Sequence, residues 1–195
     1  MYYVPNSLAA VISIFLIIVL MGLLDISKGR GNIEKIYSKT LPLLALLFNG
    51  ISILFCNTDI RQYKLLSLIN SNLSYRFSNS YKVWQLYGLS WFGQPVYVSS
   101  VEQQAIGTNI RLWLDNAYAS MILRYGIIVY AVFSILYIYL MIRLFKQGEV
   151  TLATIIFIFA VYGVMEKGLY QLTFNNYLLL FSTMLYGTTI IRGKP

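Results

Sequence analysis

The sequence predicts an all-α, polytopic integral membrane protein with about five transmembrane helices and a long outer-face loop between the second and third. Of its 195 residues, 58% are hydrophobic and only 11% are charged, whereas a soluble domain carries about 25% charged residues. Apolar runs close to the roughly 20 residues of a membrane span recur along the chain. One long segment of mixed polar character interrupts them. We therefore expect a single membrane domain, residues 1–195, organised around that segment.

The five expected transmembrane helices cover residues 8–24, 41–56, 116–143, 150–166 and 174–191. The first apolar run lacks the basic leader and the small-residue cleavage site of a signal peptide, so we interpret it as a span. The third belongs to a helical pattern that runs unbroken from Leu114 to Phe145, about 45 Å at 1.5 Å per residue. Because a hydrocarbon core is roughly 30 Å thick, its first turns are expected at or above the outer interface.

Lysine and arginine fix the predicted orientation, because they are enriched on the cytoplasmic side of membrane proteins. Eight of them fall in two connectors and the C-terminal tail: Lys28, Arg30, Lys35, Lys39, Arg143, Lys146, Arg192 and Lys194. That side is assigned to the cytoplasm, and the N-terminus and residues 57–115 to the outside. This bias accounts for much of the net charge of +8, so no nucleic-acid partner is expected.

The absence of histidine and the single cysteine, Cys56, narrow the chemistry. They exclude an internal disulfide, a Cys/His zinc site and catalytic units built on histidine. The sequence also has no Asp-rich run of the kind that binds Ca²⁺. We therefore expect neither a metal nor a cofactor.

Residues 57–115 form the expected extracytoplasmic loop. Aromatic and aliphatic residues run throughout it, unlike a disordered composition, so a folded cap is predicted. Its first part predicts a short amphipathic helix on the outer membrane surface, because apolar side chains recur there at near-helical spacing: Leu65, Leu66, Ile69 and Leu73. Trp84 and Trp91 belong to an aromatic row further on. Such rings suit sugar binding, but they also anchor proteins at membrane interfaces, so both roles stay open.

A polar row opens the third span. Asn116, Ser120 and Arg124 are spaced four residues apart and share one face of the helix. Arg124 can extend to the lipid headgroups. Alternatively, the row lines a ligand cavity, because charges inside a membrane are functional candidates. Glu166 ends the fourth span at the depth expected for Arg124, so these two side chains can pair.

Several short motifs follow one another in order along the second half of the chain. Arg76 precedes a Tyr/Trp-rich run ending in LSWFGQ at 89–94, and LDNAY and LRYGII follow at 114–118 and 123–128. Glu166 and NNYLLL at 175–180 close the series. This order resembles the C-terminal half of the polysaccharide repeat-unit polymerases (Wzy type) of capsule, exopolysaccharide and O-antigen assembly. The similarity covers about residues 55–195, and the first 55 residues match only as hydrophobic spans.

The resemblance implies a membrane glycosyltransferase in the bacterial cytoplasmic membrane. Such enzymes polymerise oligosaccharide repeat units carried on undecaprenyl diphosphate, at the outer face of the membrane. A flippase and a chain-length regulator of the same pathway are the implied protein partners. Related O-antigen ligases use a histidine in the corresponding loop, and its absence here favours a polymerase. Family members are about twice as long, so a truncated or split form is expected.

The residue types in the motifs suit this chemistry. A departing diphosphate needs its negative charge stabilised, and arginine binds phosphate with two parallel hydrogen bonds. The outer candidates for this role are Arg76, Arg111 and Arg124. With no histidine, the acceptor hydroxyl needs a carboxylate as its base, and Asp115 and Glu166 lie closest to the expected helix ends. The further expected substrate contacts are Asn116, Trp84, Trp91 and Gly93.

Two other classes of function stay open. A flippase or transporter also carries charges and aromatic residues in its membrane helices, but such sites lie near the bilayer midplane on broken helices. The polar residues of this chain are instead expected at the outer interface. A non-catalytic membrane assembly subunit is the other alternative.

Overall fold

The computed structural model describes residues 8–26, 31–72, 75–98 and 114–166, together with Leu169 and Leu179. No strand occurs among these residues, which confirms the predicted all-helical character for the part of the chain described. The elements are α1 (Leu8–Ile26), α2 (Gly31–Asn57), the 3₁₀ turn η1 (Ile60–Gln62), α3 (Lys64–Asn72), α4 (Arg76–Tyr87), α6 (Ala117–Lys146) and α7 (Val150–Tyr162). The helix expected at 174–191 lies outside the described residues.

Among the described residues, two stretches are long and apolar enough, by length and composition, to cross a membrane: Lys35–Asn57 and Ala117–Lys146. Two shorter apolar stretches accompany them, Ile14–Leu23 and Val150–Tyr162. Helix α2 is longer than the expected span at 41–56, because it begins ten residues earlier and continues through Pro42. Helix α7 ends four residues before the expected boundary at 166, since a tight turn at Gly163 to Met165 follows it.

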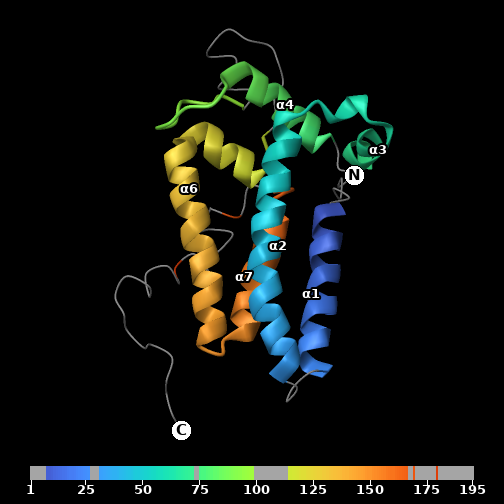
Figure 1. Cartoon of the computed structure of the whole chain (residues 1–195). Helices are drawn as coiled ribbons and strands as arrows, with labels where there is room; N and C mark the ends of the chain where they lie inside the picture. Colours follow the sequence, from blue (N-terminus) through green and yellow to red (C-terminus); the bar gives the residue numbers. More distant parts are fainter. Residues whose placement is uncertain are drawn as a thin grey trace, which may run out of the picture.

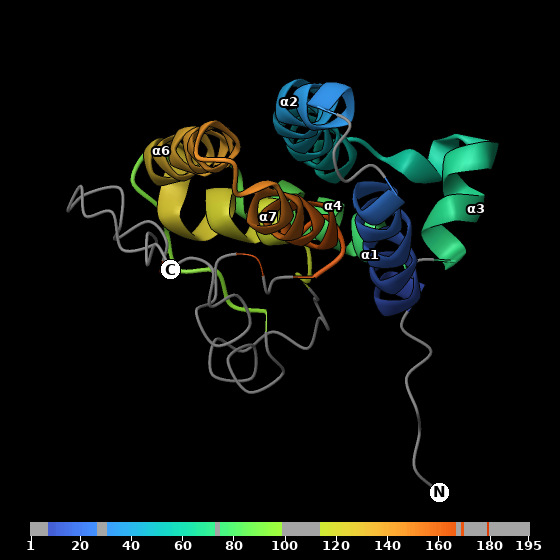
Figure 2. The ribbon, with the colours of Figure 1, turned by 90° about the horizontal axis from the view of Figure 1, so that it is seen from below.

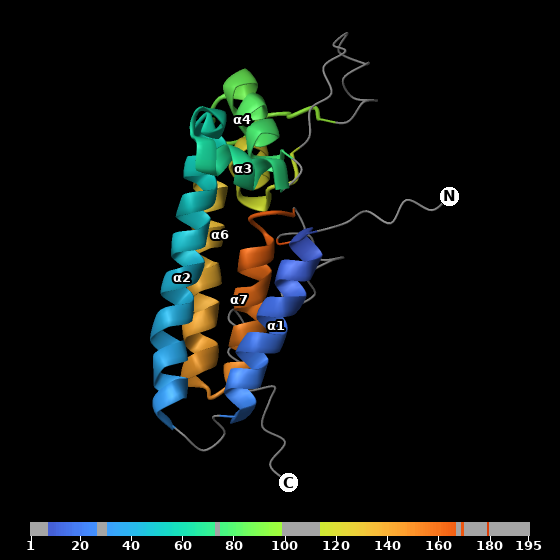
Figure 3. The ribbon, with the colours of Figure 1, turned by 90° about the vertical axis from the view of Figure 1, so that its right-hand side faces the viewer.

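Helices α1, α2, α6 and α7 lie side by side, and α3 and α4 cover one end of this bundle (Figures 1 and 3). We call this end the cap end. Helix α2 packs against α6 and α7, α1 packs against α7, and α4 reaches α2 and α6. The sides of the bundle carry large exposed apolar side chains, among them Phe15, Leu43, Leu54 and Ile135. A soluble monomer rarely leaves such a surface uncovered, and a bilayer would cover it.

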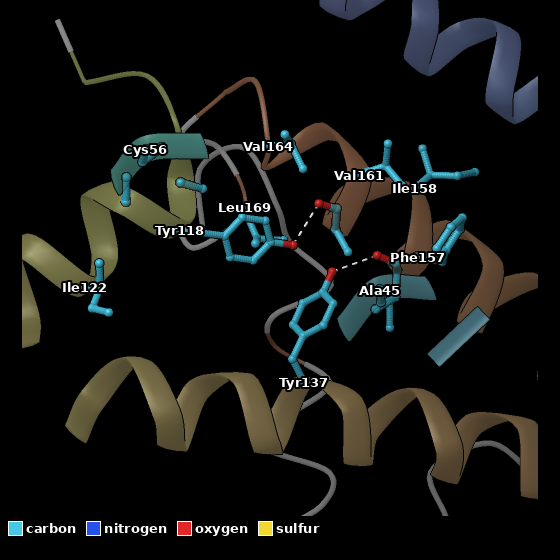
Figure 4. Close-up of a cluster of buried hydrophobic side chains, with 14 of the residues drawn as sticks. Ala45, Cys56, Tyr118, Ile122, Tyr137, Phe157, Ile158, Val161, Val164 and Leu169 are labelled. Carbon is cyan, nitrogen blue, oxygen red and sulfur yellow. Dashed lines mark hydrogen bonds between the residues drawn. The ribbon is translucent and has the colours of Figure 1, made fainter. Parts of the chain in front are cut away.

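Tyrosine hydroxyls connect the helices inside the bundle. Tyr118 and Tyr137 of α6 donate hydrogen bonds to the carbonyl oxygens of Ala160 and Ile156 in α7, at 2.8 and 2.7 Å (Figure 4). A third polar contact joins α2 to α6, where Asn49 Nδ2 donates to Ser134 Oγ at 3.1 Å. Hydrogen bonds of this kind position apolar helices whose packing alone is weakly directional.

Helix α6 is not the unbroken helix that the sequence predicts. At Gly126 the backbone adopts φ 88° and ψ 170°, outside the helical region, and the helix is interrupted there. The extended segment 88–98 lies against this break. The amides of Ile127 and Ile128 donate to the carbonyls of Ser90 and Trp91, at 3.0 and 3.3 Å. The expectation of a continuous helix was therefore wrong, because the glycine lets a distant segment replace part of the helical hydrogen bonding.

The predicted helix near residues 60–73 is present as η1 followed by α3, but its apolar residues do not share one face. Leu66 packs against the hydrophobic core. Leu65 and Leu68 point away from the protein and are 71% and 61% exposed. Leu73 lies outside the described residues.

Candidate functional site

An ion pair between Arg76 and Glu166 lies at the cap end. Arg76 begins α4, and its Nη1 is 2.5 Å from Oε1 of Glu166, in the turn after α7. The same nitrogen also donates to the carbonyl oxygen of Met165. The two side chains are 21% and 25% exposed, so the pair is shielded on one side and open on the other. The expected pairing of Glu166 with Arg124 is wrong, because the turn after α7 lies against the start of α4.

The backbone in front of Arg76 adopts an unusual conformation. Tyr75 has φ 59° and ψ 23°, and it is the one described non-glycine residue with positive φ. This conformation costs about 1–2 kcal/mol for an L-residue. Buried Asn70 maintains it, since its carbonyl accepts from the Tyr75 amide at 2.8 Å and its Oδ1 accepts from the Ser78 amide at 3.3 Å. Strained residues that neighbouring contacts hold in place cluster at functional sites.

Asn116 is buried and uses both ends of its amide. Oδ1 accepts from the Ala119 amide at 2.9 Å and so caps the N-terminus of α6. Nδ2 donates to Ser52 Oγ at 2.6 Å and to the Val164 carbonyl at 2.7 Å. These bonds join α2, α6 and the turn after α7. They give Asn116 a structural role, as the residue that caps α6.

Asp115 lies immediately before this cap and is partly exposed. Two residues later, the backbone amide of Ala117 donates a hydrogen bond to the Gly163 carbonyl at 2.8 Å. The start of α6 and the turn carrying Glu166 are therefore held together by backbone. The structure thus places both candidate carboxylates, Asp115 and Glu166, beside the same junction.

Gly93 and Gly126 come from two different motifs and meet at the break in α6. A Cβ atom added to Gly93 would lie 2.8 Å from the carbonyl carbon of Tyr125, and one added to Gly126 would lie 2.7 Å from that of Trp91. The Gln94 amide also donates to the Arg124 carbonyl at 3.1 Å. Gly93 is therefore required by this backbone crossing, independently of any contact with substrate.

Arg124 lies directly before the break. Its Nε is buried and has no hydrogen-bond partner among the described residues. A buried guanidinium nitrogen without an acceptor is costly, so a bound anion here would satisfy it. Ser120, on the same helix face, is buried.

The two tryptophans differ in their surroundings. Trp84 is 6% exposed and belongs to the core between α4 and the bundle, so its ring has a packing role. Trp91 is 65% exposed beside the break in α6, and its neighbour Phe92 is also exposed. Trp91 is therefore the tryptophan of this pair whose ring a sugar or a lipid headgroup can reach. Arg111 lies outside the described residues.

Within the described ranges, no three His, Cys, Asp or Glu side chains gather as metal ligands. Sequence reasoning missed three features of the site: the Arg76–Glu166 pair, the crossing of Gly93 and Gly126, and the strained Tyr75. The glycines had a signal, since each lies in one of the quoted motifs. Tyr75 had none, because non-glycine residues rarely adopt positive φ.

The chain matches no family model, no curated protein sequence and no solved structure. The resemblance to the repeat-unit polymerases therefore depends on the motif residues alone.

Proposed function

We propose that the chain is a repeat-unit polymerase, or part of one, that joins lipid-diphosphate-linked oligosaccharides at the cap end. The observation that carries this proposal is a pair of contacts at the cap end that connect residues of four separate motifs two by two. Arg76 contacts Glu166 across 90 positions of the sequence. Gly93 lies against the backbone of Arg124 and Tyr125. Motifs that follow one another along the sequence thus also contact one another at one end of the bundle.

The proposed reaction transfers a growing glycan from its lipid carrier. The bond between the anomeric carbon and the diphosphate oxygen breaks, and a hydroxyl oxygen of the incoming unit bonds to that carbon. The lipid diphosphate leaves with the electron pair, and guanidinium groups stabilise its charge. Arg76 and Arg124 are the described candidates for this role, and Arg111 is the third expected one.

The hydroxyl proton needs an acceptor, and we assign this role to Glu166. Its carboxylate pairs with Arg76. A diphosphate that binds Arg76 competes for that guanidinium and frees the carboxylate to accept a proton. Asp115 is the alternative base, because it is partly exposed beside the same junction. Trp91 offers an exposed ring for a sugar.

The proposal includes the membrane arrangement. Helices α1, α2, α6 and α7 provide four spans, and residues 174–191 provide the fifth. The cap end, with residues 57–115, faces the outside of the bacterial cytoplasmic membrane. The chain-length regulator and flippase of such a pathway would meet it in that membrane.

A flippase or transporter is the second candidate, because broken helices bind substrates in many transporters. The break in α6 favours this alternative. However, it lies nine residues into a 30-residue helix, roughly 14 Å from its start and nearer one end than the middle. The amides of Ile127 and Ile128 are also engaged by carbonyls rather than free for a ligand. Deletion of the gene and its complementation with site variants also test the third alternative, a non-catalytic assembly subunit.

Deletion of the gene, followed by gel analysis of surface glycan, tests the proposal. Loss of a polymerase leaves single repeat units at the surface, whereas loss of a flippase leaves no repeat units there. The native gene should restore long glycan, and Arg76→Ala should not, because removing a charged contact to a buried anion costs about 2–5 kcal/mol. Arg76→Lys should restore little, since the bidentate geometry is lost.

Lys82→Gln is the matched control, because Lys82 is an exposed cation on the same helix α4. Its glycan should have the native length. Glu166→Gln and Asp115→Asn separate the two bases, since loss of general-base help typically costs 10²–10⁴-fold in rate. If Arg76→Ala and Arg124→Ala both insert in the membrane and both restore native glycan length, the proposal is wrong.

A further inference from the structure

A groove of about 550 Å³ runs along the outward side of α3. It is lined by Lys64, Leu65, Ser67, Leu68, Ser71 and Tyr75. Its volume falls within the roughly 300–1,000 Å³ of sites that bind small molecules. The lining surface is mainly apolar, with one cation and the hydroxyls of Ser67, Ser71 and Tyr75.

The opposite side of α3 holds the helix on the protein. Leu66 packs against the core, and Asn70 is buried and accepts the Tyr75 amide. The outward side has no such cover, since Leu65 and Leu68 are both exposed. A short helix with apolar side chains on both faces belongs partly immersed at an interface, rather than on top of it.

The position of α3 brings the groove to the lipid around the bundle. Seen along the bundle, α3 lies outside the group formed by α1, α2, α6 and α7 (Figure 2). Seen from the side, it lies just beyond the cap end of α1 (Figure 3). A bilayer that surrounds the bundle would therefore meet the groove at the depth of its headgroups.

The charges near the groove favour an anionic occupant. Arg61 is paired with Asp59 at 2.7 Å, and its hydrogen-bonded guanidinium holds the pKa of that carboxyl below its usual value. Lys64 is exposed and has no ion-pair partner among the described residues. The net charge left at the rim of the groove is therefore positive. The Ser67 hydroxyl adds a donor that suits phosphate oxygens, whereas the Ser71 hydroxyl already donates to the Leu68 carbonyl at 2.8 Å.

We propose that this groove binds one anionic phospholipid, with an acyl chain along Leu65, Leu68 and Tyr75 and the headgroup phosphate at Lys64. The site depends on the chain residing in a membrane, and it does not depend on the proposed reaction. Free phosphate does not explain the apolar lining, and a neutral lipid does not use the cation.

Fluorescence quenching by brominated lipids tests the site in vesicles of phosphatidylcholine. A single fluorescent label is placed at Gln62→Cys, in a Cys56→Ser background, because Gln62 is exposed beside the groove without lining it. Brominated phosphatidylglycerol should quench the label at a mole fraction about five-fold lower than brominated phosphatidylcholine, the preference expected for one lysine at the surface. Lys64→Gln should abolish this preference, and Lys82→Gln should retain it.

The paired change Leu65→Ser and Leu68→Ser should weaken quenching by both lipids, whereas Leu86→Ser, an exposed leucine on α4, should not. Equal quenching by the two lipids in the native background would overturn the proposal, as would a preference that survives Lys64→Gln. Quenching by neither lipid would mean that something other than phospholipid covers α3, and would overturn it too. If the leucine variant fails to fold, the Lys64→Gln comparison decides.

Discussion

Gly93 and Gly126 lie where two backbone segments cross: a side chain on Gly126 would meet the backbone of Trp91 and Gly93, and one on Gly93 would meet the backbone of Arg124 and Tyr125. Both have positive φ, 92° and 88°, a conformation that only glycine adopts without cost. Gly93 belongs to the extended segment after α4, and Gly126 interrupts α6. The crossing therefore couples the cap to the longest described helix, next to Arg124.

Gly93→Ala should destabilise the protein by about 2–5 kcal/mol, which combines a left-handed backbone cost of about 1–2 with overpacking of about 1–3. Relief of the clash requires movement of backbone in α6 rather than of a flexible side chain. The thermal unfolding midpoint of the purified protein in detergent measures the change. Gly126→Ala should destabilise the protein by a similar amount.

Two other glycines separate the cost of the backbone conformation from the cost of the steric clash. Gly88 also has positive φ, 67°, but an added Cβ would meet nothing within 4 Å, so Gly88→Ala should show the backbone cost alone. Gly50 is helical with open space around it, and Gly50→Ala should be neutral or stabilise by up to about 1 kcal/mol. Equal effects at Gly88 and Gly93 would contradict the steric explanation.

Asn116→Asp tests the buried junction at the start of α6. At an exposed cap this change is nearly neutral, because aspartate caps as well as asparagine. Here it removes the donor to Ser52 and Val164 and places a carboxylate against a carbonyl oxygen, so a loss of about 1–3 kcal/mol or more is expected. Thermal unfolding is again the measurement. Asp115→Asn, one position earlier, should change the free energy of unfolding by no more than about 0.5 kcal/mol. Native stability in Asn116→Asp would show that the hydrogen bonds of Asn116 do not stabilise the contact between α2, α6 and the turn after α7.

Tyr118→Phe should cost about 1 kcal/mol, because it removes the hydroxyl that donates to the Ala160 carbonyl. Tyr139→Phe is the matched control on the same helix, since Tyr139 is exposed on the outside of the bundle. The unfolding midpoint of Tyr118→Phe should be lower than that of Tyr139→Phe. Identical midpoints would show that the Tyr118 hydrogen bond does not stabilise the bundle.

Cysteine labelling of whole cells tests the orientation. In a Cys56→Ser background, Lys82→Cys on α4 should react with an impermeant reagent from outside, and Gln147→Cys, just after α6, should react only after the membrane is opened. Both positions are exposed, and α6 separates them because it runs from the cap end to the other end of the bundle. Labelling of Gln147→Cys in intact cells would reverse the proposed topology.

Composition and apolar periodicity predict what depends on local sequence. The all-helical character of the described residues is confirmed, and the start of α6 at Ala117 follows Asn116, a residue type that favours helix caps. The break at Gly126 was not predicted, because it depends on hydrogen bonds to Ser90 and Trp91, more than thirty residues earlier. A single glycine in an apolar run carries no sign of a partner so far away.

The ion pair shows a second limit. Sequence reasoning estimates how deep a residue lies along a span, and it placed Arg124 and Glu166 at the same depth. It does not tell which way a helix faces or which neighbour it has, so it did not identify Arg76 as the partner of Glu166. The roles proposed for Asp115, Arg111 and Trp91 stay predictions.

The pairing of Arg76 with Glu166 has a consequence for the order of events during biosynthesis. Ninety residues separate the two, so Arg76 leaves the ribosome roughly 5–18 s before its partner at 5–20 residues per second. Throughout this interval Arg76 has neither of its acceptors, Glu166 and the Met165 carbonyl, although α4 already has α2 to pack against. The ion pair is therefore a late contact of α4, and a chain interrupted before Glu166 cannot form it.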